Sequence, residues 1–401
     1  MILQSKAQME KTKTYNTAKV LHLCFLIIAT IVFSSCNRQL ASAYKHRTGA
    51  DTYVQNTQPN ITIHNCSMPF DISSGYILIS SVVNGTNDTL IFDTGFNGEV
   101  LQRKDKQFLN KDSCRVIYVN AHYKSRQRQY IKPILNSYLT NQLMTISDFT
   151  VNEYYLEQTC SDLTYSLLGN KPLKNRILTL DFDNQKIGLY DTDSLVDYGG
   201  YTKAYAVLDS LTGFFFVYIT VDGEKKLMLF DTGAPDNAFT IKEYRYCKDD
   251  RVLYGKLFDD LNQSKVKDKL IIGKRNLSID EANHNITRVS YSEIRRNVLG
   301  LAFISQYNWI LDYKNARVYY RKAVNSRYNG ADTDFDTVKN RVTTVDGKLE
   351  VCLNQKEQKR KYKLYKQIES VDGQNVTDSN ICHFKQLLNS ESWDNHTVKL
   401  R

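Results

Sequence analysis

The hexapeptide Leu-Ile-Phe-Asp-Thr-Gly at Leu90–Gly95 decides the fold of this chain, and Met-Leu-Phe-Asp-Thr-Gly at Met228–Gly233 repeats it. In each copy an apolar run ends abruptly in Asp-Thr-Gly. The pattern predicts a buried strand that runs into a tight turn, and the turn presents one carboxylate. Two such turns in one chain suggest a site built from a pair of aspartates, Asp93 and Asp231.

Each hexapeptide is predicted to be the return strand of a hairpin. An apolar segment precedes each one and ends in Asn84-Gly85 in the first half and in Asp222-Gly223 in the second. Both dipeptides favour two-residue hairpin turns because their residues tolerate positive φ. The wealth of aromatic residues, with 27 Tyr and 17 Phe, also favours sheet over helix. The expected fold class is therefore mainly β.

The order and spacing of three sequence blocks indicate an internal duplication. The aspartates of the two hexapeptides are 138 positions apart (231 − 93). Hydrophobic-hydrophobic-Gly triplets follow downstream, and their glycines, Gly169 and Gly300, are 131 apart (300 − 169). Asp181 and Asp312, which belong to two further predicted hairpins, are also 131 apart (312 − 181). Chance similarity of short apolar runs would not keep both order and spacing. Within the first half, residues 103–148 are predicted to form short strands and loops.

The N-terminal segment has the pattern of a targeting signal. Lysines precede an apolar run at 20–33, which is shorter than the ~20 residues needed to span a bilayer. The run ends in Val32-Phe33-Ser34-Ser35-Cys36, and small residues directly before a Cys resemble a bacterial lipoprotein signal with lipid on the Cys36 sulfur. A plain secretory signal and an uncleaved anchor are the alternatives. We expect an exported chain, anchored in a membrane of the cell envelope and facing the periplasm or the exterior.

The composition changes after residue 322, and the last part of the chain predicts a small separate domain. A strand, an Asp372-Gly373 turn, a short amphipathic helix capped by Asp378 or Ser379, and a final strand resemble the second half of a PDZ domain. No Gly-Leu-Gly-Phe-like carboxylate loop precedes these elements. This absence favours a tail that packs on the rest of the chain over one that binds a peptide end by strand addition.

Charge and cysteine content argue against other classes of function. The net charge is +10, but no basic block interleaved with aromatics follows the pattern of a nucleic-acid site, so no nucleic-acid partner is expected. Eight cysteines are present, and six of them lie outside the signal and the lipidation position. Their spacing does not reveal a pairing. Neither CxxC nor HExxH occurs, so we expect no metal and no cofactor.

The repeated blocks resemble an aspartic peptidase of the retropepsin-like (pepsin-like) type, with two Asp-Thr-Gly lobes fused in one chain and a PDZ-like tail, as in bacterial exported lipoproteins. The resemblance rests on hydrophobic-hydrophobic-Asp-Thr-Gly followed by hydrophobic-hydrophobic-Gly, which occurs twice within residues 60–322. It implies a bilobal, duplicated acid-protease β-barrel fold. It also implies hydrolysis of an extended peptide by a water activated between Asp93 and Asp231, so that one chain supplies the whole dyad and a monomer suffices.

The resemblance also assigns roles to the neighbours of the aspartates. The residues implied to support the dyad are Thr94, Gly95, Thr232 and Gly233. The second turn continues with Ala234, as the family prefers, whereas the first continues with Phe96, where a small residue is usual; both are candidates for the substrate cleft. Tyr118 is a candidate substrate cover in a flap at 114–130, and ordinary strand packing is the alternative for that side chain.

The expected organisation contains six parts. They are a lipoprotein signal peptide at 1–36, a tether at 37–59, a first lobe at 60–196, a second lobe at 197–323, a linker at 324–341 and a PDZ-like domain at 342–401. Two functions fit this organisation. The first is a membrane-tethered aspartic endopeptidase, and the second is a non-catalytic lipoprotein that binds exported peptides with the same fold. The intact pair of Asp-Thr-Gly turns favours the enzyme.

Overall fold

The computed structural model describes residues 59–105, 115–120, 126–156, 165–257, 266–280, 284–328, 340–345, 347–358, 361–390 and 392–401. All of them belong to one compact unit, Gln55–Arg401. The expected signal peptide, the lipidation position Cys36 and most of the tether lie outside the described residues. Within the described residues, no helix is both long enough and apolar enough to cross a membrane.

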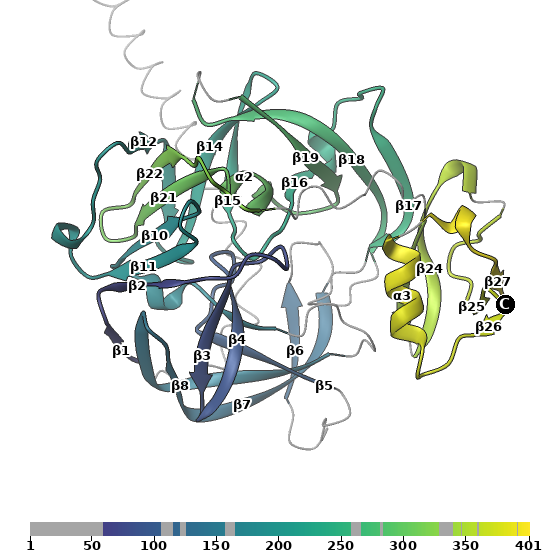
Figure 1. Cartoon of the computed structure of the whole chain (residues 1–401), viewed down its shortest axis with the longest axis horizontal. Coiled ribbons are helices and arrows are strands. Elements are labelled where there is room, and N and C mark those ends of the chain that lie inside the picture. The colour runs from purple at the N-terminus through teal and green to yellow at the C-terminus, as the bar shows by residue number, and fades with distance from the viewer. Residues whose placement is uncertain are drawn as a thin grey trace, which may run out of the picture. The chain divides into compact units, whose positions relative to one another are not determined.

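Strand pairing closes the first half of the chain into a six-stranded barrel, called lobe 1 below. The strands of this sheet are β1 Asn60–Ile63, β3 Leu78–Val83, β4 Thr86–Phe92, β5 Val100–Asp105, β6 Arg115–Asn120, β7 Arg126–Thr140, β8 Met144–Leu156 and β9 Ser166–Leu168. The barrel runs in the order β3-β4-β9-β5-β8-β7, and β7 pairs back with β3. β1 and β6 extend the sheet by pairing with β8 and β7 (Figure 1).

The second half forms a barrel with the same strand order, called lobe 2. Its elements are β13 Ala206–Asp209, β14 Phe214–Val221, β15 Glu224–Phe230, β16 Asn237–Thr240, β17 Arg251–Leu257, β18 Val266–Ser278, β19 His284–Ser292, β20 Val298–Leu299 and the helix α2 Leu301–Ile304. The barrel runs β14-β15-β20-β16-β19-β18, and β18 pairs back with β14. In both lobes the hexapeptide strand pairs in parallel with the triplet strand, β4 with β9 and β15 with β20.

A six-stranded sheet joins the two lobes, and its pairing is symmetric. Its strands are β2 Cys66–Pro69, β10 Ile177–Asp181, β11 Lys186–Tyr190, β12 Thr202–Ala204, β21 Tyr307–Asp312 and β22 Arg317–Lys322. The strand order is β12-β22-β21-β10-β11-β2. Strands at equal distances from the two edges are equivalent in the two halves of the chain: β12 and β2, β22 and β11, and β21 and β10. At its centre Leu178 lies opposite Leu311, and Leu180 lies opposite Trp309. Equivalent positions in the two halves differ by 131, so Leu178 corresponds to Trp309 and Leu180 to Leu311. Each of the two pairs is therefore the symmetry mate of the other. The sheet therefore has the pairing of a local two-fold axis.

The predicted hairpins are confirmed. Asn84 and Gly85 have φ of 50° and 80°, and Asp222 and Gly223 have φ of 48° and 86°. Positive φ at both central residues is the backbone of a type I′ turn, whose twist matches that of the flanking strands. Short 3-10 helices complete the fold at η4 Lys171–Leu173, η5 Asp193–Leu195, η6 Ile241–Glu243, η8 Lys356–Gln358 and η9 Trp393–Asn395.

The expectation of short strands over residues 103–148 is confirmed at β6, Arg115–Asn120, and is wrong from residue 126 onward. Two long strands, β7 with 15 residues and β8 with 13, occupy much of this region. The pairing register of β7 shifts between Ile134 and Leu139, and Asn136 has a φ of 51°. Such irregularities bend a strand and interrupt the alternation of apolar and polar side chains. The first part of β7 therefore pairs with β6 and its end with β3, and the sequence shows no continuous strand pattern.

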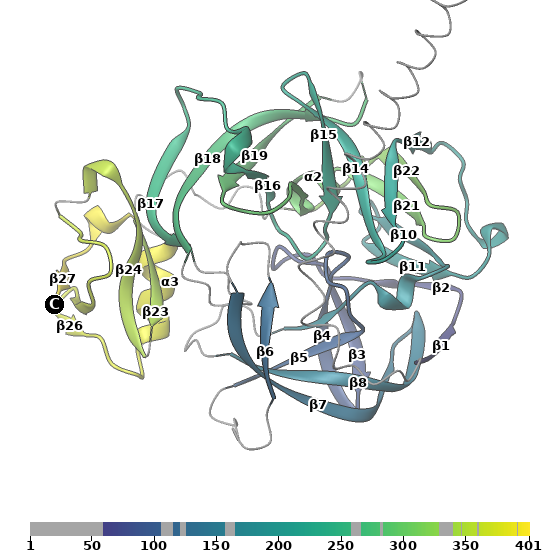
Figure 2. The same ribbon diagram turned by 180° about the vertical axis from the view of Figure 1, so that it is seen from behind.

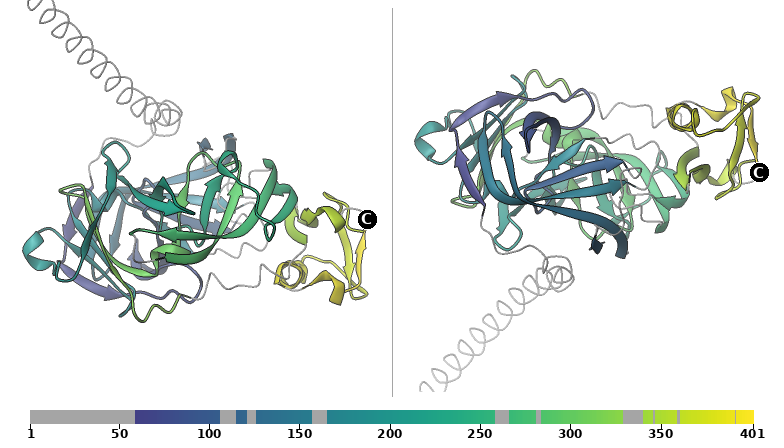
Figure 3. Two further views of the ribbon diagram at one scale, coloured as in Figure 1. Left: turned by 90° about the horizontal axis from the view of Figure 1, so that it is seen from above. Right: turned by 90° about the horizontal axis from the view of Figure 1, so that it is seen from below.

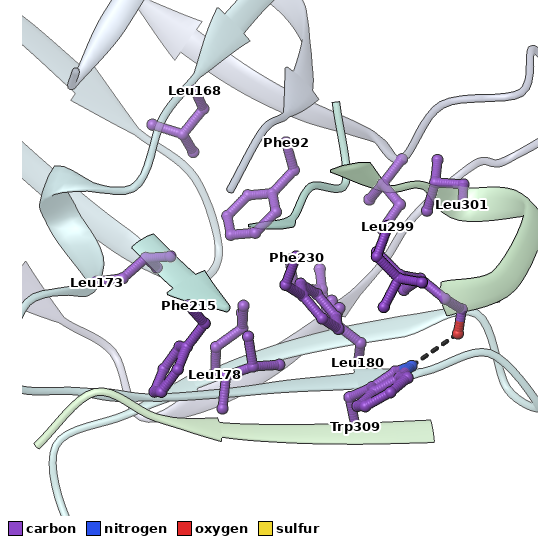
Figure 4. Close-up of a cluster of buried hydrophobic side chains, with 14 of the residues drawn as sticks. Phe92, Leu168, Leu173, Leu178, Leu180, Phe215, Phe230, Leu299, Leu301 and Trp309 are labelled. Atoms are coloured by element: carbon purple, nitrogen blue, oxygen red, sulfur yellow. Dashed lines mark hydrogen bonds between the residues drawn. The ribbon is translucent and has the colours of Figure 1, made fainter. Parts of the chain in front are cut away.

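A core of aromatic and leucine side chains includes the residues that directly precede the two Asp-Thr-Gly turns (Figure 4). Phe92 and Phe230, the last residues of the hexapeptide strands, are both almost fully buried. The ring of Phe230 meets Trp309 edge-on at a centroid distance of 5.0 Å. The Trp309 indole N–H donates to the carbonyl oxygen of Ile304 at 2.7 Å, so this buried polar group is satisfied. The core therefore fixes the strand ends that carry the aspartates.

The C-terminal residues form a separate small core. Their elements are β23 Asn340–Val345, β24 Lys348–Gln355, β25 Ile368–Val371, β26 Gln374–Asn375, α3 Ile381–Ser390 and β27 Val398–Leu400. The apolar residues expected on the helix face this core. The expected helix cap, Asp378 or Ser379, is wrong, because α3 begins at Ile381 directly after Asn380. Asn380 instead accepts a hydrogen bond from the Thr377 N–H at 2.7 Å.

The tail is joined to lobe 2 by strand pairing. β24 pairs in an antiparallel sense with β17, with Tyr254 opposite Asn354, so the lobe 2 sheet continues into the tail (Figures 2 and 3). Gly255 has a φ of 149°, and a Cβ at this position would lie 2.0 Å from the carbonyl oxygen of Cys352. Only glycine admits so close an approach of the two backbones. Leu253, Leu270 and Leu353 pack with Cys352 at this joint.

Candidate active site

Both aspartates stand directly after a strand, and the triplet strand of the same lobe fixes each of them. Asp93 follows β4, and its N–H donates to the carbonyl oxygen of Leu168 at 2.9 Å. Asp231 follows β15, and its N–H donates to the carbonyl oxygen of Leu299 at 3.0 Å. The parallel pairing of hexapeptide and triplet thus continues one residue beyond each strand. The two turns are therefore held by equivalent backbone hydrogen bonds.

The two threonines brace the turns against each other. The Thr94 N–H donates to the Thr232 hydroxyl at 3.0 Å, and the Thr232 N–H donates to the Thr94 hydroxyl at 3.0 Å. Each hydroxyl also donates to a carbonyl oxygen of the other lobe: Thr94 to Phe230 at 2.9 Å and Thr232 to Phe92 at 2.6 Å. Both side chains are buried. Four hydrogen bonds in a water-poor site thus hold the two lobes in one register.

The two glycines bring the carboxyl groups together. A Cβ on Gly95 would lie 2.3 Å from the Asp231 carboxyl carbon, and a Cβ on Gly233 would lie 2.3 Å from the Asp93 carboxyl carbon. Each carboxyl group therefore rests on the glycine of the opposite turn, in the space that a side chain would fill. The Gly95 N–H donates to Asp93 at 2.8 Å, and the Gly233 N–H donates to Asp231 at 2.9 Å. One chain supplies both carboxyl groups.

Burial is the main influence on the protonation of Asp231. It raises the pKa of Asp231 to about 6, against the opposing effects of a hydrogen bond with Asp93 and of the backbone N–H groups of Gly233 and Ala234. Two buried carboxyl groups in contact cannot both ionise readily, so they hold one proton between them over a range of pH. The pair can therefore offer an ionised and a protonated carboxyl group at the same time.

The triplet glycines admit the chain that follows each turn. A Cβ on Gly169 would lie 2.6 Å from the carbonyl oxygen of Phe96, and a Cβ on Gly300 would lie 2.7 Å from that of Ala234. The Asn170 N–H donates to the Phe96 carbonyl oxygen at 2.9 Å, and the Leu301 N–H donates to that of Ala234 at 2.8 Å. The triplets therefore pack behind the turns, and their glycines leave room for the chain that crosses them.

Phe96 and Ala234 occupy equivalent positions directly after the two turns, and their side chains fill very different volumes. The Phe96 ring lies over the backbone of lobe 1, where a Cβ on Gly98 would meet it at 2.4 Å and one on Gly169 at 2.6 Å. It is half-buried and packs with a small apolar cluster that includes Leu78, Ile91 and Leu167. Ala234 leaves the corresponding place in lobe 2 without a ring. The two lobes therefore present unlike surfaces beside their aspartates.

Of the two other candidate residues, Tyr118 is described by its backbone alone and Cys36 is not described. Tyr118 lies in β6, opposite Arg128 of β7, in the hairpin where a flap is expected. The Tyr118 side chain and Cys36 are outside the described residues. Among the cysteines that the structure describes, Cys66, Cys247 and Cys352 are free, and Cys382 is disulfide-bonded. The described residues contain no group of three or more His, Cys, Asp or Glu side chains placed to hold a metal ion.

Arg296 was missed in the sequence, although it lies close to the site. Its guanidinium carbon is 5.9 Å from the ring centres of both Phe214 and Phe216, and the Arg296 charge acts to lower the pKa of Asp231 against the effect of burial. The spacing of the duplication offers a signal for it. Position 296 corresponds to Tyr165 at the triplet offset of 131 (296 − 165), and both residues stand two positions before their triplet.

Comparison with known proteins adds little to this geometry. No protein-family profile and no curated protein matches the chain. Among solved structures, the chain is similar to basic 7S globulin from soybean, with 11% sequence identity and a TM-score of 0.36 over 69% of this chain and 99% of that chain. A likeness this distant carries no argument about fold or activity.

Proposed function

We propose that the chain is an aspartic endopeptidase of the retropepsin-like type, in which Asp93 and Asp231 activate a water for hydrolysis of a peptide bond. The observation that carries the proposal is the reciprocal seating of each carboxyl group on the glycine of the opposite turn. A turn with only a structural role has no need for a second carboxyl group against it. Burying two such groups together costs free energy unless they are paired, and sites that shift pKa values in this way are commonly functional.

The proposed mechanism uses the unequal protonation of the pair. The ionised carboxylate accepts a proton from the water as its oxygen attacks the carbonyl carbon of the scissile amide. The protonated carboxyl group donates its proton to the carbonyl oxygen, and a tetrahedral diol forms. Collapse of the diol breaks the C–N bond: the amide nitrogen takes up a proton from the protonated carboxyl group, and a diol hydroxyl returns a proton to the ionised one. The products are one carboxyl and one amino terminus, and no covalent intermediate or metal is required.

The architecture supports the duplicated acid-protease fold as part of the same proposal. Two closed six-stranded barrels share one strand order, and a sheet with two-fold pairing joins them. A substrate would then lie extended between the lobes, across Asp93 and Asp231. The tail, residues 342–401, is proposed to be a PDZ-like domain. The proposed location is the cell envelope, with the chain exported and lipid-anchored through Cys36, and a single chain is proposed to suffice for activity.

The test is cleavage of a mixed peptide library by the chain from residue 37 onward. Asp93→Asn and Asp231→Asn should each reduce cleavage by more than about a thousandfold while leaving the circular dichroism spectrum unchanged. A statine-type compound, which places a hydroxyl where the attacking oxygen would lie, should inhibit the wild type. Equal cleavage by the wild type and both variants would overturn the assignment of the dyad. Saturable peptide binding without any cleavage would instead support the peptide-binding lipoprotein.

A further inference from the structure

The side of lobe 1 that carries Asp93 is an apolar wall. Ile91 stands two positions before Asp93, so the two side chains leave the strand on the same side. Leu78 lies opposite Ile91 on β3, and Leu167 lies beside it on β9. These side chains form a cluster separate from the main core, and further partly buried apolar and aromatic residues pack against it: Tyr76, Phe96, Leu101 and Tyr165.

Lobe 2 builds the corresponding wall with one change of chemistry. Phe216 lies opposite Leu229 on β14, and Val298 lies beside Leu229 on β20. Here, however, the half-buried Arg296 takes the place of Tyr165, and its guanidinium carbon lies 5.9 Å from the ring centres of Phe214 and Phe216. Cations are held over aromatic faces at such distances. Lobe 2 therefore presents a cation on the wall beside Asp231.

The charge of Arg296 also reaches the site. Burial is the largest influence on Asp231 and raises its pKa, whereas Arg296 is among the groups that oppose this rise. Such an effect needs a short distance or a medium of low dielectric constant. A substrate side chain that lies between the lobe 2 wall and Asp231 would therefore experience the same positive charge.

We propose that Arg296 determines specificity, and that the preferred substrate carries Asp or Glu on the side of the scissile bond held by lobe 2 and a large apolar residue on the side held by lobe 1. This inference rests on the proposed peptidase function. A guanidinium group matches a carboxylate with two parallel N–H donors, and its planar face can remain on the aromatic rings while its edge binds. A Lys or Arg side chain at the same place would be repelled, which adds discrimination.

The test compares cleavage preferences of the full-length chain purified in detergent. A peptide library randomised at the positions around the scissile bond is digested by the wild type and by Arg296→Glu, Arg296→Gln and Arg295→Gln. The wild type should prefer Asp or Glu over Lys or Arg at one position by about 10- to 100-fold in kcat/KM. Arg296→Gln should abolish the preference, and Arg296→Glu should reverse it. Arg295→Gln, which changes the neighbouring arginine, should keep the wild-type profile.

The outcomes separate this inference from the proposed function. Cleavage that depends on Asp93 and Asp231 but has the same charge profile in the wild type and both Arg296 variants would overturn the inference alone. An equal loss of kcat/KM for acidic, neutral and basic peptides would also overturn it, because Arg296 would then act on the dyad and not on the substrate. Absence of any dyad-dependent cleavage by the wild type would overturn both proposals. Arg296→Gln keeps the test informative if the charge reversal unfolds the chain.

Discussion

Thr94 and Thr232 exchange identical hydrogen bonds across the junction of the two lobes, each backbone N–H donating to the other hydroxyl at 3.0 Å. The contact joins residues 138 positions apart, so it forms only when both halves have folded. It sits directly beside the carboxyl groups of Asp93 and Asp231. The stability of the junction and the geometry of the site are therefore linked through the same two side chains.

Replacing either threonine by valine should destabilise the fold at nearly constant side-chain volume. In Thr232→Val the Thr94 N–H loses its acceptor and the Phe92 carbonyl oxygen loses its donor, and both groups are buried. The expected cost is roughly 2–4 kcal/mol of unfolding free energy, measured by urea denaturation. Thr232→Ser retains the hydroxyl and should lose much less. Equal stability of the Val and Ser variants would show that the brace contributes nothing.

A methyl group on either turn glycine should sharply reduce the proposed peptidase activity. In Gly95→Ala the new Cβ would lie 2.3 Å from the Asp231 carboxyl carbon, which is closer than a Cβ atom packs against a non-bonded neighbour. The carboxyl groups must then separate, and a misplacement of about 1 Å in a catalytic group costs about a hundredfold or more in rate. The measurement is kcat/KM on a peptide that the wild type cleaves.

Gly85→Ala is the matched control for that substitution. Gly85 lies in the hairpin turn before the same strand, has a φ of 80° and has no atom within 4 Å of a new Cβ. The substitution should cost roughly 1 kcal/mol of stability through backbone strain and leave the rate unchanged. If Gly95→Ala lost no more activity than Gly85→Ala, the contact of each carboxyl group with the glycine of the opposite turn would have no catalytic importance.

The sequence predicted the features that depend on local pattern. Asp-Thr-Gly after an apolar strand, a two-residue turn before it and a triplet glycine after it each have a fixed short-range signature, and the structure contains all three in both halves. The constant offsets also predicted that Asp93 and Asp231 belong together. Duplication turns a distant contact into a repeated local pattern, and this is why the centre of the site could be predicted.

Features that depend on tertiary pairing could not be predicted in the same way. The bulges of β7 interrupt the alternation that marks a strand, so its 15 residues read as shorter pieces. The contact of Arg296 with two rings of β14 joins residues 80 or more positions apart. The duplication offset marks the position of Arg296, but no sequence pattern predicts its contact with these rings. The pairing of β17 with β24 likewise uses backbone groups, which carry no pattern of residue types.

The protonation of Asp231 should make stability depend on pH in a defined window. Burial raises the pKa of Asp231 from 3.8 to about 6, so the folded state holds a proton more tightly than the unfolded state. This contribution is fully present below about pH 4 and is lost as the pH rises through about 6. The wild type should therefore lose up to roughly 3 kcal/mol relative to Asp231→Asn between these pH values.

The measurement is the difference in unfolding free energy between the wild type and Asp231→Asn at several pH values. Both proteins share every other ionisable group, so most other contributions cancel. Asp93 is the exception because it is in contact with Asp231, and Asp93→Asn should be measured beside it. A difference that stays constant from about pH 4 to about pH 7 would contradict a raised pKa at this site.

The joint between the tail and lobe 2 should depend on Gly255. A Cβ at this position would lie 2.0 Å from the Cys352 carbonyl oxygen, so Gly255→Ala should separate β24 from β17. Cys352 reports on this event, because it is a free thiol buried at the joint and burial raises its pKa to about 12. In the wild type it should react slowly with a thiol reagent, whereas the exposed Cys247 should react at once. In Gly255→Ala the rate at Cys352, followed by peptide mass mapping, should rise by about tenfold or more, since a thiol reacts as its exposed thiolate.

Gly347→Ala, at a turn glycine with open space around it, should leave Cys352 protected. If Cys352 stayed equally protected in both variants, the tail would be held by contacts other than this strand pairing.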